Sequence, residues 1–234
     1  MSIGLYATRI SAEVLTKGES SSMSYREFPD VNYYWCMVDL VQSSNYRLVE
    51  GPERGYLRGE SFFTLVRSAT RPYVDLRAFK EIGDAVLLCS DGFRPMFEAC
   101  VLMAVAARHL AHVAASPVYP FAIRLGIDFG LGKKLDRPQE DYLGESIDRL
   151  ARLMSVRSAT SNFLIGEPAY TTNRRILMEY ESFCEFSKPL RLDLPAGKQL
   201  SELVVYREVR IRHEDATEFA DFFTEWRKAS GQRR

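Results

Sequence analysis

Two aspartates stand among apolar residues, and they are the side chains of this chain best suited to chemistry. Asp39 lies near the end of the apolar run 34–40, before a polar turn at 41–45, and Asp84 lies on the turn of an apolar hairpin at 79–88. A carboxylate in such surroundings is costly to bury unless it is paired or binds a cation. Since Mg²⁺ takes one or two carboxylates together with substrate phosphate oxygens, the pair predicts a shared divalent-metal site. The alternative is that each aspartate caps a turn or a helix.

The residues that follow Asp39 add groups of the same kind. The backbone carbonyl of Leu40 is a candidate metal ligand beside the two carboxylates. Gln42, Ser43 and Ser44 lie in the polar turn, and successive backbone N–H groups in a turn can bind phosphate oxygens. A metal and a phosphate chain are therefore expected side by side at this end of the strand.

A second candidate group lies on a helix expected to begin at Gly144. Asp148 and Arg152 are four residues apart, so they share one face of that helix. Taken alone, they are typical of a surface ion pair of small energy. An arginine on a fixed helix can also stabilise negative charge in a substrate.

The bulk composition excludes several classes of protein. The chain has 234 residues, enough for one domain with arms, and its 31 basic residues balance its 31 acidic residues, so no global charge points to nucleic acid or membrane. No apolar run is long enough to span a bilayer. Four cysteines in apolar surroundings are expected as buried thiols, which favours a reducing compartment and a soluble, cytoplasmic protein. The three histidines lie away from the acidic motifs and are expected to be structural or solvated.

The order of elements predicts an α+β fold with a ferredoxin-like antiparallel sheet covered by helices. Three parts are expected, which are an N-terminal arm (1–30), a catalytic domain (31–212) and a C-terminal helix with a tail (213–234). Within them, strands are predicted at 32–42, 73–80, 84–90, 121–128, 162–166, near 182–194 and at 202–211; helices at 56–70, 91–112, 144–156, 168–179 and 214–228; and a loop at 130–141.

Four blocks of the chain resemble the catalytic domain of class III nucleotide cyclases. In that family a strand ends in Asp-Ile-x-Gly-Phe/Ser-Thr, a hairpin carries Lys-x-x-Gly-Asp, a strand reads Arg-x-Gly-Ile-His-x-Gly, and an Asp-x-x-Gly-x-x-Val-Asn-x-x-x-Arg block follows. The corresponding blocks here are 39–44, 80–84, 124–130 and 141–152, in the same order and with the same internal spacing. Any one block is a weak signal, whereas four in register are a strong one.

The resemblance implies a role for each candidate residue. Asp39, Asp84 and the Leu40 carbonyl would hold two Mg²⁺ or Mn²⁺ ions, and Arg152 would stabilise the pentavalent phosphorus. Asp148 replaces the family asparagine, and Asp128 replaces a family histidine without an expected catalytic consequence. Family members of this kind work as head-to-tail homodimers in which one subunit supplies the metal ligands and the other the base-reading residues and the arginine.

Two interpretations of the substrate remain open. Lys80 and Asp141 occupy the base-reading positions and form the adenine-type pair, which indicates ATP and cyclic AMP. A short chain with an altered transition-state helix also resembles the bacterial pyrimidine cyclases of Pycsar anti-phage systems, whose cyclic UMP or cyclic CMP activates a separate effector protein. Phe79, Tyr142 and Met37 are bulky enough to fill the space beside a smaller base, and UTP is favoured over CTP.

Two other functions are weighed against a cyclase. A non-catalytic module that binds a nucleotide or a protein is kept as an alternative because Asp148 departs from the family pattern. A diguanylate synthase is disfavoured because the hairpin at 82–85 lacks the Gly-Gly-Asp/Glu-Glu-Phe sequence of those enzymes.

Overall fold

The computed structural model of the chain describes residues 30–113, 119–135, 141–156, 162–192, 204–212 and 224–225. The expected N-terminal arm and nearly all of the expected helix at 214–228 lie outside these residues.

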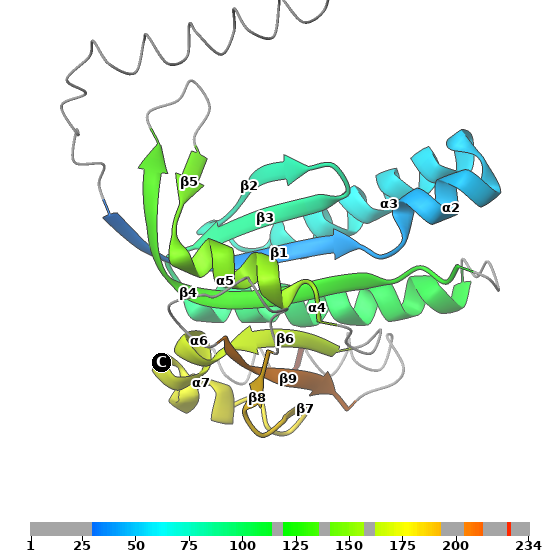
Figure 1. Cartoon of the computed structure of the whole chain (residues 1–234). Coiled ribbons are helices and arrows are strands. Elements are labelled where there is room, and N and C mark those ends of the chain that lie inside the picture. Colours follow the sequence, from blue (N-terminus) through cyan, green and yellow to red (C-terminus); the bar gives the residue numbers. More distant parts are fainter. Residues whose placement is uncertain are drawn as a thin grey trace, which may run out of the picture.

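One mixed sheet runs through the described part of the chain and supplies the frame for the site (Figure 1). Its strand order is β2-β3-β1-β4-β6-β9-β7, with β5 paired to β4 and β8 paired to β9. The strands are β1 (Asp30–Leu40), β2 (Leu76–Ile82), β3 (Ala85–Ser90), β4 (Ile123–Leu135), β5 (Asp141–Leu143), β6 (Asn162–Gly166), β7 (Cys184–Phe186), β8 (Leu190–Arg191) and β9 (Val205–Ile211). The first strand therefore lies inside the sheet, between β3 and β4, as the ferredoxin-like prediction requires.

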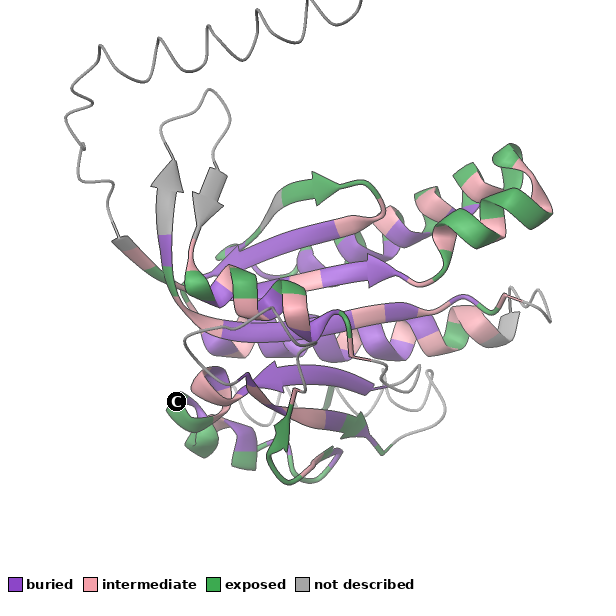
Figure 2. Ribbon diagram, viewed as in Figure 1, coloured by how far each residue is buried: buried purple, intermediate pink, exposed green. Residues whose placement is uncertain are grey.

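Helices cover both faces of the sheet, and the interior strands are buried while α2 and much of α3 are exposed (Figure 2). The helices are α2 (Ser43–Glu50), α3 (Pro52–Thr70), α4 (Phe93–Val113), α5 (Glu145–Leu153), α6 (Glu167–Thr172) and α7 (Arg174–Met178). None of these described helices combines the length and the apolar character needed to cross a membrane.

Alternation along β1 assigns its side chains to the two faces. Cys36 and Val38 join the larger core under α3 and α4, whereas Trp35 joins the smaller core under α5. Successive side chains of a strand point to opposite faces, so Asp39 shares its face with Trp35 and α5. The candidate metal ligand and the helix with Asp148 and Arg152 thus lie on the same side of the sheet.

The structure corrects three element boundaries. The expected turn at 41–45 ends at Ser43, where α2 begins. No residue of α2 is buried, so the start of this helix has the polar sequence that is typical of a turn. The expected loop from Gly130 is instead a continuation of β4 to Leu135, paired with β5. The expected helix at 168–179 is two short helices, because Asn173 leaves the helical conformation and accepts a hydrogen bond from Tyr34.

The four cysteines are all buried and unbridged. Their burial agrees with the prediction from their apolar surroundings. The Sγ atoms of Cys36 and Cys100 lie 3.4 Å apart where β1 meets α4.

Candidate active site

The two aspartates predicted to converge do meet at the carboxyl-terminal end of β1. Asp39 pairs in register with Ala85, the residue after Asp84, and the Leu40 amide donates a hydrogen bond to the Asp84 carbonyl at 3.0 Å. The Ser43 hydroxyl, on the first turn of α2, donates to the Asp84 carboxylate. Two carboxylates and a hydroxyl, from β1, the turn between β2 and β3, and the start of α2, thus lie close together.

Arg124 on β4 joins this group, although sequence reasoning gave it no role. Its Nε and Nη2 both donate to Oδ2 of Asp39, the former at 2.8 Å. Its Nη1 donates to the carbonyl of Met154, just beyond α5, at 2.9 Å. The sequence marks Arg124 only as the first residue of the third family-like block. Its place beside Asp39 follows from the pairing of β4 with β1. Arg124 therefore ties the carboxylate of Asp39 to the end of the helix that carries Arg152.

The environment of Asp39 disfavours an uncompensated negative charge. The residue is buried, and burial is the largest influence that raises its pKa. The charge and hydrogen bonds of Arg124 lower the pKa, whereas the nearby charge of Asp84 raises it further. A cation placed between the two carboxylates would relieve both the burial cost and their repulsion.

The backbone after Leu40 is held by a buried arginine from α3. Arg58 donates from Nη2 to the carbonyls of Val41 and Pro120 at 3.2 and 3.0 Å, and from Nη1 to the carbonyl of Tyr119 at 2.9 Å. Its guanidinium carbon lies 4.4 Å from the ring centroid of Tyr46 on α2, and burial lowers its pKa. A positive charge is thereby fixed behind the turn that leads from Asp39 into α2.

Gln42 gives that turn its shape. It is a non-glycine residue with a left-handed backbone (φ 57°), and its carbonyl accepts the amide of Tyr46 to start α2. No side chain caps the first turn of α2, so the amides of Ser43 and Ser44 are among the N–H groups that have no partner within a helix. The predicted phosphate-binding segment 42–44 is therefore a helix start rather than a free loop.

Asp148 and Arg152 lie on α5 and do not form the ion pair considered for them. Asp148 is exposed and Arg152 is partly exposed, and neither carries a hydrogen bond or ion pair to another described side chain. Leu150 and Leu153, which alternate with them along the helix, are fully buried against the sheet. The apolar stripe of α5 thus turns the two polar residues away from the core.

The two predicted base-reading residues lie on different parts of the sheet. Lys80 is exposed on β2, opposite Leu87 of β3. Asp141 begins β5 opposite Leu135, at the end of β4 that is remote from Arg124; its side chain lies outside the described residues. Because β4 runs antiparallel to β1, Asp141 is at the opposite end of the sheet from Asp39.

The oxygen atoms at Asp39 and Asp84 suit a hard divalent cation. Mg²⁺ and Mn²⁺ prefer carboxylate, hydroxyl and carbonyl oxygens, and these two carboxylates with Ser43 are of that kind. Across the described residues, no group of three or more His, Cys, Asp or Glu side chains gathers to hold a metal without help. Two protein carboxylates leave coordination positions for phosphate oxygens, as in sites where the metal enters with a nucleotide.

The chain was compared with known proteins by sequence and by structure. No protein-family model matches the chain, and no curated protein matches it in sequence. Solved structures do match. The adenylyl cyclase CyaB of P. aeruginosa has a TM-score of 0.63 at 16% identity, covering 81% of this chain and 98% of that one. The catalytic core of a rhodopsin-guanylyl cyclase with converted specificity, in complex with ATPαS, has a TM-score of 0.62 at 14% identity, covering 80% and 99%.

A further structure extends the comparison to another kind of organism. An adenylate cyclase of Trypanosoma brucei in its monomeric state has a TM-score of 0.60 at 15% identity, covering 77% of this chain and 88% of that one. The chain therefore has the α+β fold of class III adenylyl and guanylyl cyclase catalytic domains, and nearly all of each such domain is represented in it.

Proposed function

We propose that this protein is a metal-dependent nucleotide cyclase, which converts a nucleoside triphosphate to the 3′,5′-cyclic monophosphate and pyrophosphate. The observation that carries the proposal is the meeting of Asp39 and Asp84 at the end of the central strand, in a chain with the fold of cyclase catalytic domains. The fold alone does not specify chemistry, but two converging carboxylates at this position are the part of the site that the chemistry needs.

Two Mg²⁺ or Mn²⁺ ions would be held by Asp39 and Asp84, with the carbonyl of Leu40 as a further ligand. When bound, such ions neutralise the triphosphate and lower the pKa of the attacking hydroxyl. The protein contributes the fixed geometry, since β1, β3 and the start of α2 hold the oxygen atoms in place before the ions arrive.

The triphosphate would lie along the start of α2. The amides of Gln42, Ser43 and Ser44 face the anion in this proposal, where the positive end of the helix dipole favours it. With a divalent ion as the counter-charge of Asp39, the guanidinium of Arg124 would be available to the phosphate oxygens. Arg58 holds the same turn from behind.

The reaction needs no protein nucleophile. The ribose 3′-oxygen attacks the α-phosphorus in line, a new P–O bond forms, the bond to the β-phosphate oxygen breaks, and pyrophosphate leaves while the hydroxyl proton passes to solvent. Arg152 stabilises the charge that grows on the phosphoryl oxygens, as a fixed arginine does in other phosphoryl transfers. An ionised Asp148 accepts but does not donate hydrogen bonds, so its role is to accept one from a ribose hydroxyl.

The proposed site is shared between two chains. Asp141 is at the opposite end of the sheet from Asp39 within one chain, which supports a head-to-tail homodimer. In such a dimer the metal ligands of one subunit face Lys80, Asp141, Asp148 and Arg152 of the other. Each dimer then contains two equivalent sites.

UTP is the proposed substrate, with cyclic UMP read by a separate effector protein in anti-phage defence. The support is the carboxylate of Asp148 where the cyclase family has an asparagine, together with the partly buried Met37 of β1, which is bulky enough to fill space beside a smaller base. ATP is the alternative, favoured by the Lys80–Asp141 pair and by the adenylyl cyclases among the similar structures. If metal and nucleotide bind without turnover, the protein is a non-catalytic nucleotide-binding module.

A product assay tests the proposal. The purified protein is incubated with Mn²⁺ and each of the four nucleoside triphosphates, and cyclic nucleotide and pyrophosphate are quantified. We expect cyclic UMP and pyrophosphate in equal amounts from the wild type, and none from Asp39→Asn or Asp84→Asn. If cyclic AMP is the main product, the substrate is ATP and the assignment of UTP is wrong. The absence of cyclic product from every nucleotide, with thermal stabilisation by Mn²⁺ and nucleotide, would favour the binding module.

A further inference from the structure

Between Arg124 and Gly132, the face of β4 that meets α5 presents two glycines and one acid. Even-numbered residues of β4 point toward α5, and Gly126 and Gly130 flank Asp128 on this face. A Cβ at Gly126 would lie 3.1 Å from Cδ1 of Leu150, and one at Gly130 would lie 3.1 Å from Cβ of Ser146. The helix therefore rests directly on the strand, and Asp128 is the one side chain of this triplet that projects from the strand beneath it.

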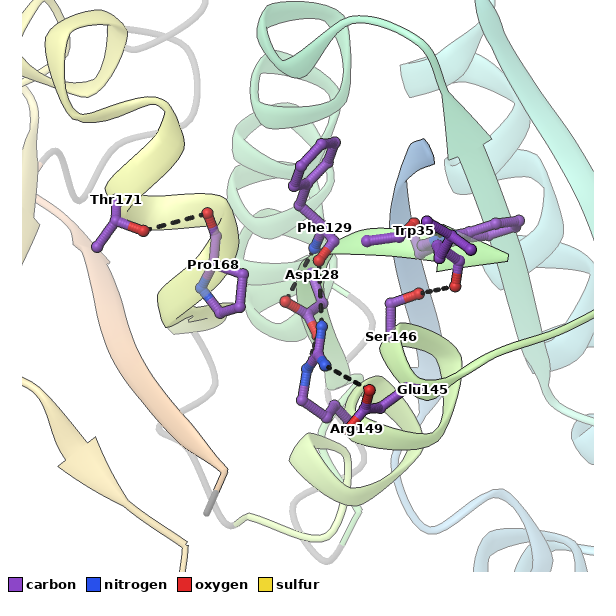
Figure 3. A network of polar contacts seen from close by, with 10 residues as sticks. Trp35, Asp128, Phe129, Glu145, Ser146, Arg149, Pro168 and Thr171 are labelled. Atoms are coloured by element: carbon purple, nitrogen blue, oxygen red, sulfur yellow. Dashed lines mark hydrogen bonds and ion pairs between the residues drawn. The ribbon is translucent and has the colours of Figure 1, made fainter. Parts of the chain in front are cut away.

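Asp128 is fully buried and forms an ion pair with Arg149 of α5 (Figure 3). The Nε of Arg149 donates to Oδ2 at 2.8 Å, and its Nη2 donates to the carbonyl of Phe129 at 3.1 Å. The amide of Phe129 donates to Oδ1 of Asp128 at 2.8 Å. Both carboxylate oxygens thus have a donor, and the guanidinium bridges the side chain and the backbone of β4.

The surroundings are shaped around this pair. A side chain at Gly166 of β6 would collide with the Asp128 carboxylate. The Ser146 hydroxyl adds a bond from α5 to the carbonyl of Leu131 at 2.9 Å, and Arg149 also faces Glu145 one turn earlier at 4.0 Å. Burial raises the pKa of Asp128, and Arg149 opposes that effect. The guanidinium of Arg149 and the amide of Phe129 both favour the ionised carboxylate against the cost of burial.

Stability alone does not account for a buried ion pair here. Apolar residues of similar volume usually stabilise a core as well as a buried pair or better, and α5 already packs through Leu150 and Leu153. An apolar seam permits a helix to slide or turn slightly, whereas hydrogen bonds from a planar guanidinium fix both its rotation and its height. Directional bonds are thus suited to a helix whose exposed residues must be placed accurately.

Arg149 occupies the position between the two candidate catalytic residues of α5. It follows Asp148 directly and precedes Arg152 by three residues. At its other end, α5 is held by the bond from Arg124 to Met154. We propose that Asp128 and Arg149 are positioning residues, whose ion pair fixes the rotation of α5 so that Arg152 and Asp148 reach the substrate. The inference rests on the proposed cyclase function, and it gives Asp128 a role that the sequence did not indicate.

The test compares two arginine–carboxylate ion pairs, in which the arginine side chains are 13% and 16% exposed and the carboxylates 0% and 27% exposed. In the first variant, Asp128→Asn with Arg149→Gln, the pair becomes a neutral amide pair and no buried charge is left alone; glutamine is shorter than arginine, and the control carries the same arginine-to-glutamine change. The control is Glu167→Gln with Arg207→Gln, which treats in the same way the ion pair between α6 and β9, whose Nε and Nη2 contacts are 3.0 and 3.1 Å. We expect kcat to fall roughly tenfold to a hundredfold in the first variant, since a displacement of about 1 Å costs that much. KM for the nucleotide and the Mn²⁺ affinity stay unchanged, and the control retains wild-type kcat.

Hydrogen exchange of α5 gives a second measurement that does not need catalysis. We expect the amides of residues 147–153 to exchange about tenfold faster in the Asp128/Arg149 variant, while those of β1 do not change. A variant with wild-type kcat, or with unchanged exchange in α5, overturns the inference. If the wild type makes no cyclic nucleotide, the proposed function fails and hydrogen exchange alone decides whether the pair holds the helix.

Subunit mixing separates a positioning effect from general damage. Mixed with Asp84→Ala chains, the Asp128/Arg149 variant is expected to regain activity, because its own metal ligands then face an intact α5. Mixed with Arg152→Ala chains, it is expected to show no recovery above its own reduced rate. Equal recovery with both partners, or recovery with Arg152→Ala alone, contradicts the assignment of the ion pair to α5.

Discussion

Replacing Arg124 by methionine should strengthen metal binding while it weakens catalysis. In the unliganded protein the guanidinium donates two hydrogen bonds to the Asp39 carboxylate, so an incoming cation must compete with it. Methionine keeps much of the aliphatic volume and removes that competition. Asp39 and Asp84 are then left with unbalanced negative charge, which a divalent ion relieves.

The size of the effect follows from the contacts. A hydrogen bond to a charged group contributes about 1.5–3 kcal/mol, and the Arg124 side chain is 39% exposed, so solvent screening reduces this toward the lower limit. About 1.4 kcal/mol corresponds to a tenfold change in a binding constant. We therefore expect Mn²⁺ to bind Arg124→Met roughly tenfold more tightly than wild type in the absence of nucleotide. We also expect kcat/KM for the nucleotide to fall by at least about tenfold, because the variant lacks the guanidinium that in the wild type would contact the phosphates.

Titration calorimetry with Mn²⁺ measures the first quantity and steady-state kinetics the second. Arg191→Met is the matched control, since Arg191 is exposed on β8 at the other side of the sheet; neither quantity should change there. Weaker Mn²⁺ binding in Arg124→Met would refute the reasoning, because it would mean that Arg124 supports the metal site rather than competing for Asp39. Unchanged Mn²⁺ affinity would refute it as well.

Four further outcomes are expected. Arg152→Ala should lower kcat by about 10³-fold with little change in nucleotide KM; a loss confined to KM in steady-state kinetics would contradict its role. Mixing Asp84→Ala with Arg152→Ala chains should restore one intact site per heterodimer in the product assay, and failure to recover would contradict the shared site. Because burial raises the pKa of Asp39 above its ordinary 3.8, and only the ionised carboxylate binds a cation, Mn²⁺ affinity measured by calorimetry should begin to fall at a higher pH than for an exposed aspartate; a midpoint at 3.8 or below would argue against this. Lys80→Ala should change the order in which the four nucleoside triphosphates are preferred as substrates, with a smaller effect on the rate with the poorest substrate. An unchanged order of preference would exclude Lys80 from base recognition.

The meeting of Asp39 and Asp84, 45 residues apart in sequence, was predictable from the strand pattern and the expected ferredoxin-like order of strands. Asp39 and Asp84 each interrupt an apolar strand, and antiparallel pairing of β1 with β3 brings the two together once the first strand lies inside the sheet. Period-two alternation then places Asp39 on the α5 face. The sequence pattern supplies the alternation, and the expected fold supplies the pairing of the two strands.

The residues that hold the site together were not predictable in the same way. Arg58, Arg124 and Arg149 act through partners 17 to 85 residues away in sequence, and a single sequence does not show such pairs. The start of α2 resembles a polar turn in sequence because no residue of this helix is buried and it has no apolar stripe. The glycines of β4 make room for α5 and Trp35. Because glycines also suggest turns, the sequence favours a loop where β4 in fact continues.

Anomalous diffraction from crystals grown with Mn²⁺ and a non-hydrolysable nucleoside triphosphate tests the central claim most directly. We predict a manganese peak within about 2.0–2.3 Å of a carboxylate oxygen of both Asp39 and Asp84 and of a phosphate oxygen, with Arg124 turned from Asp39 toward the triphosphate. A manganese peak elsewhere, or a nucleotide bound away from these carboxylates with Arg124 still on Asp39, would contradict it.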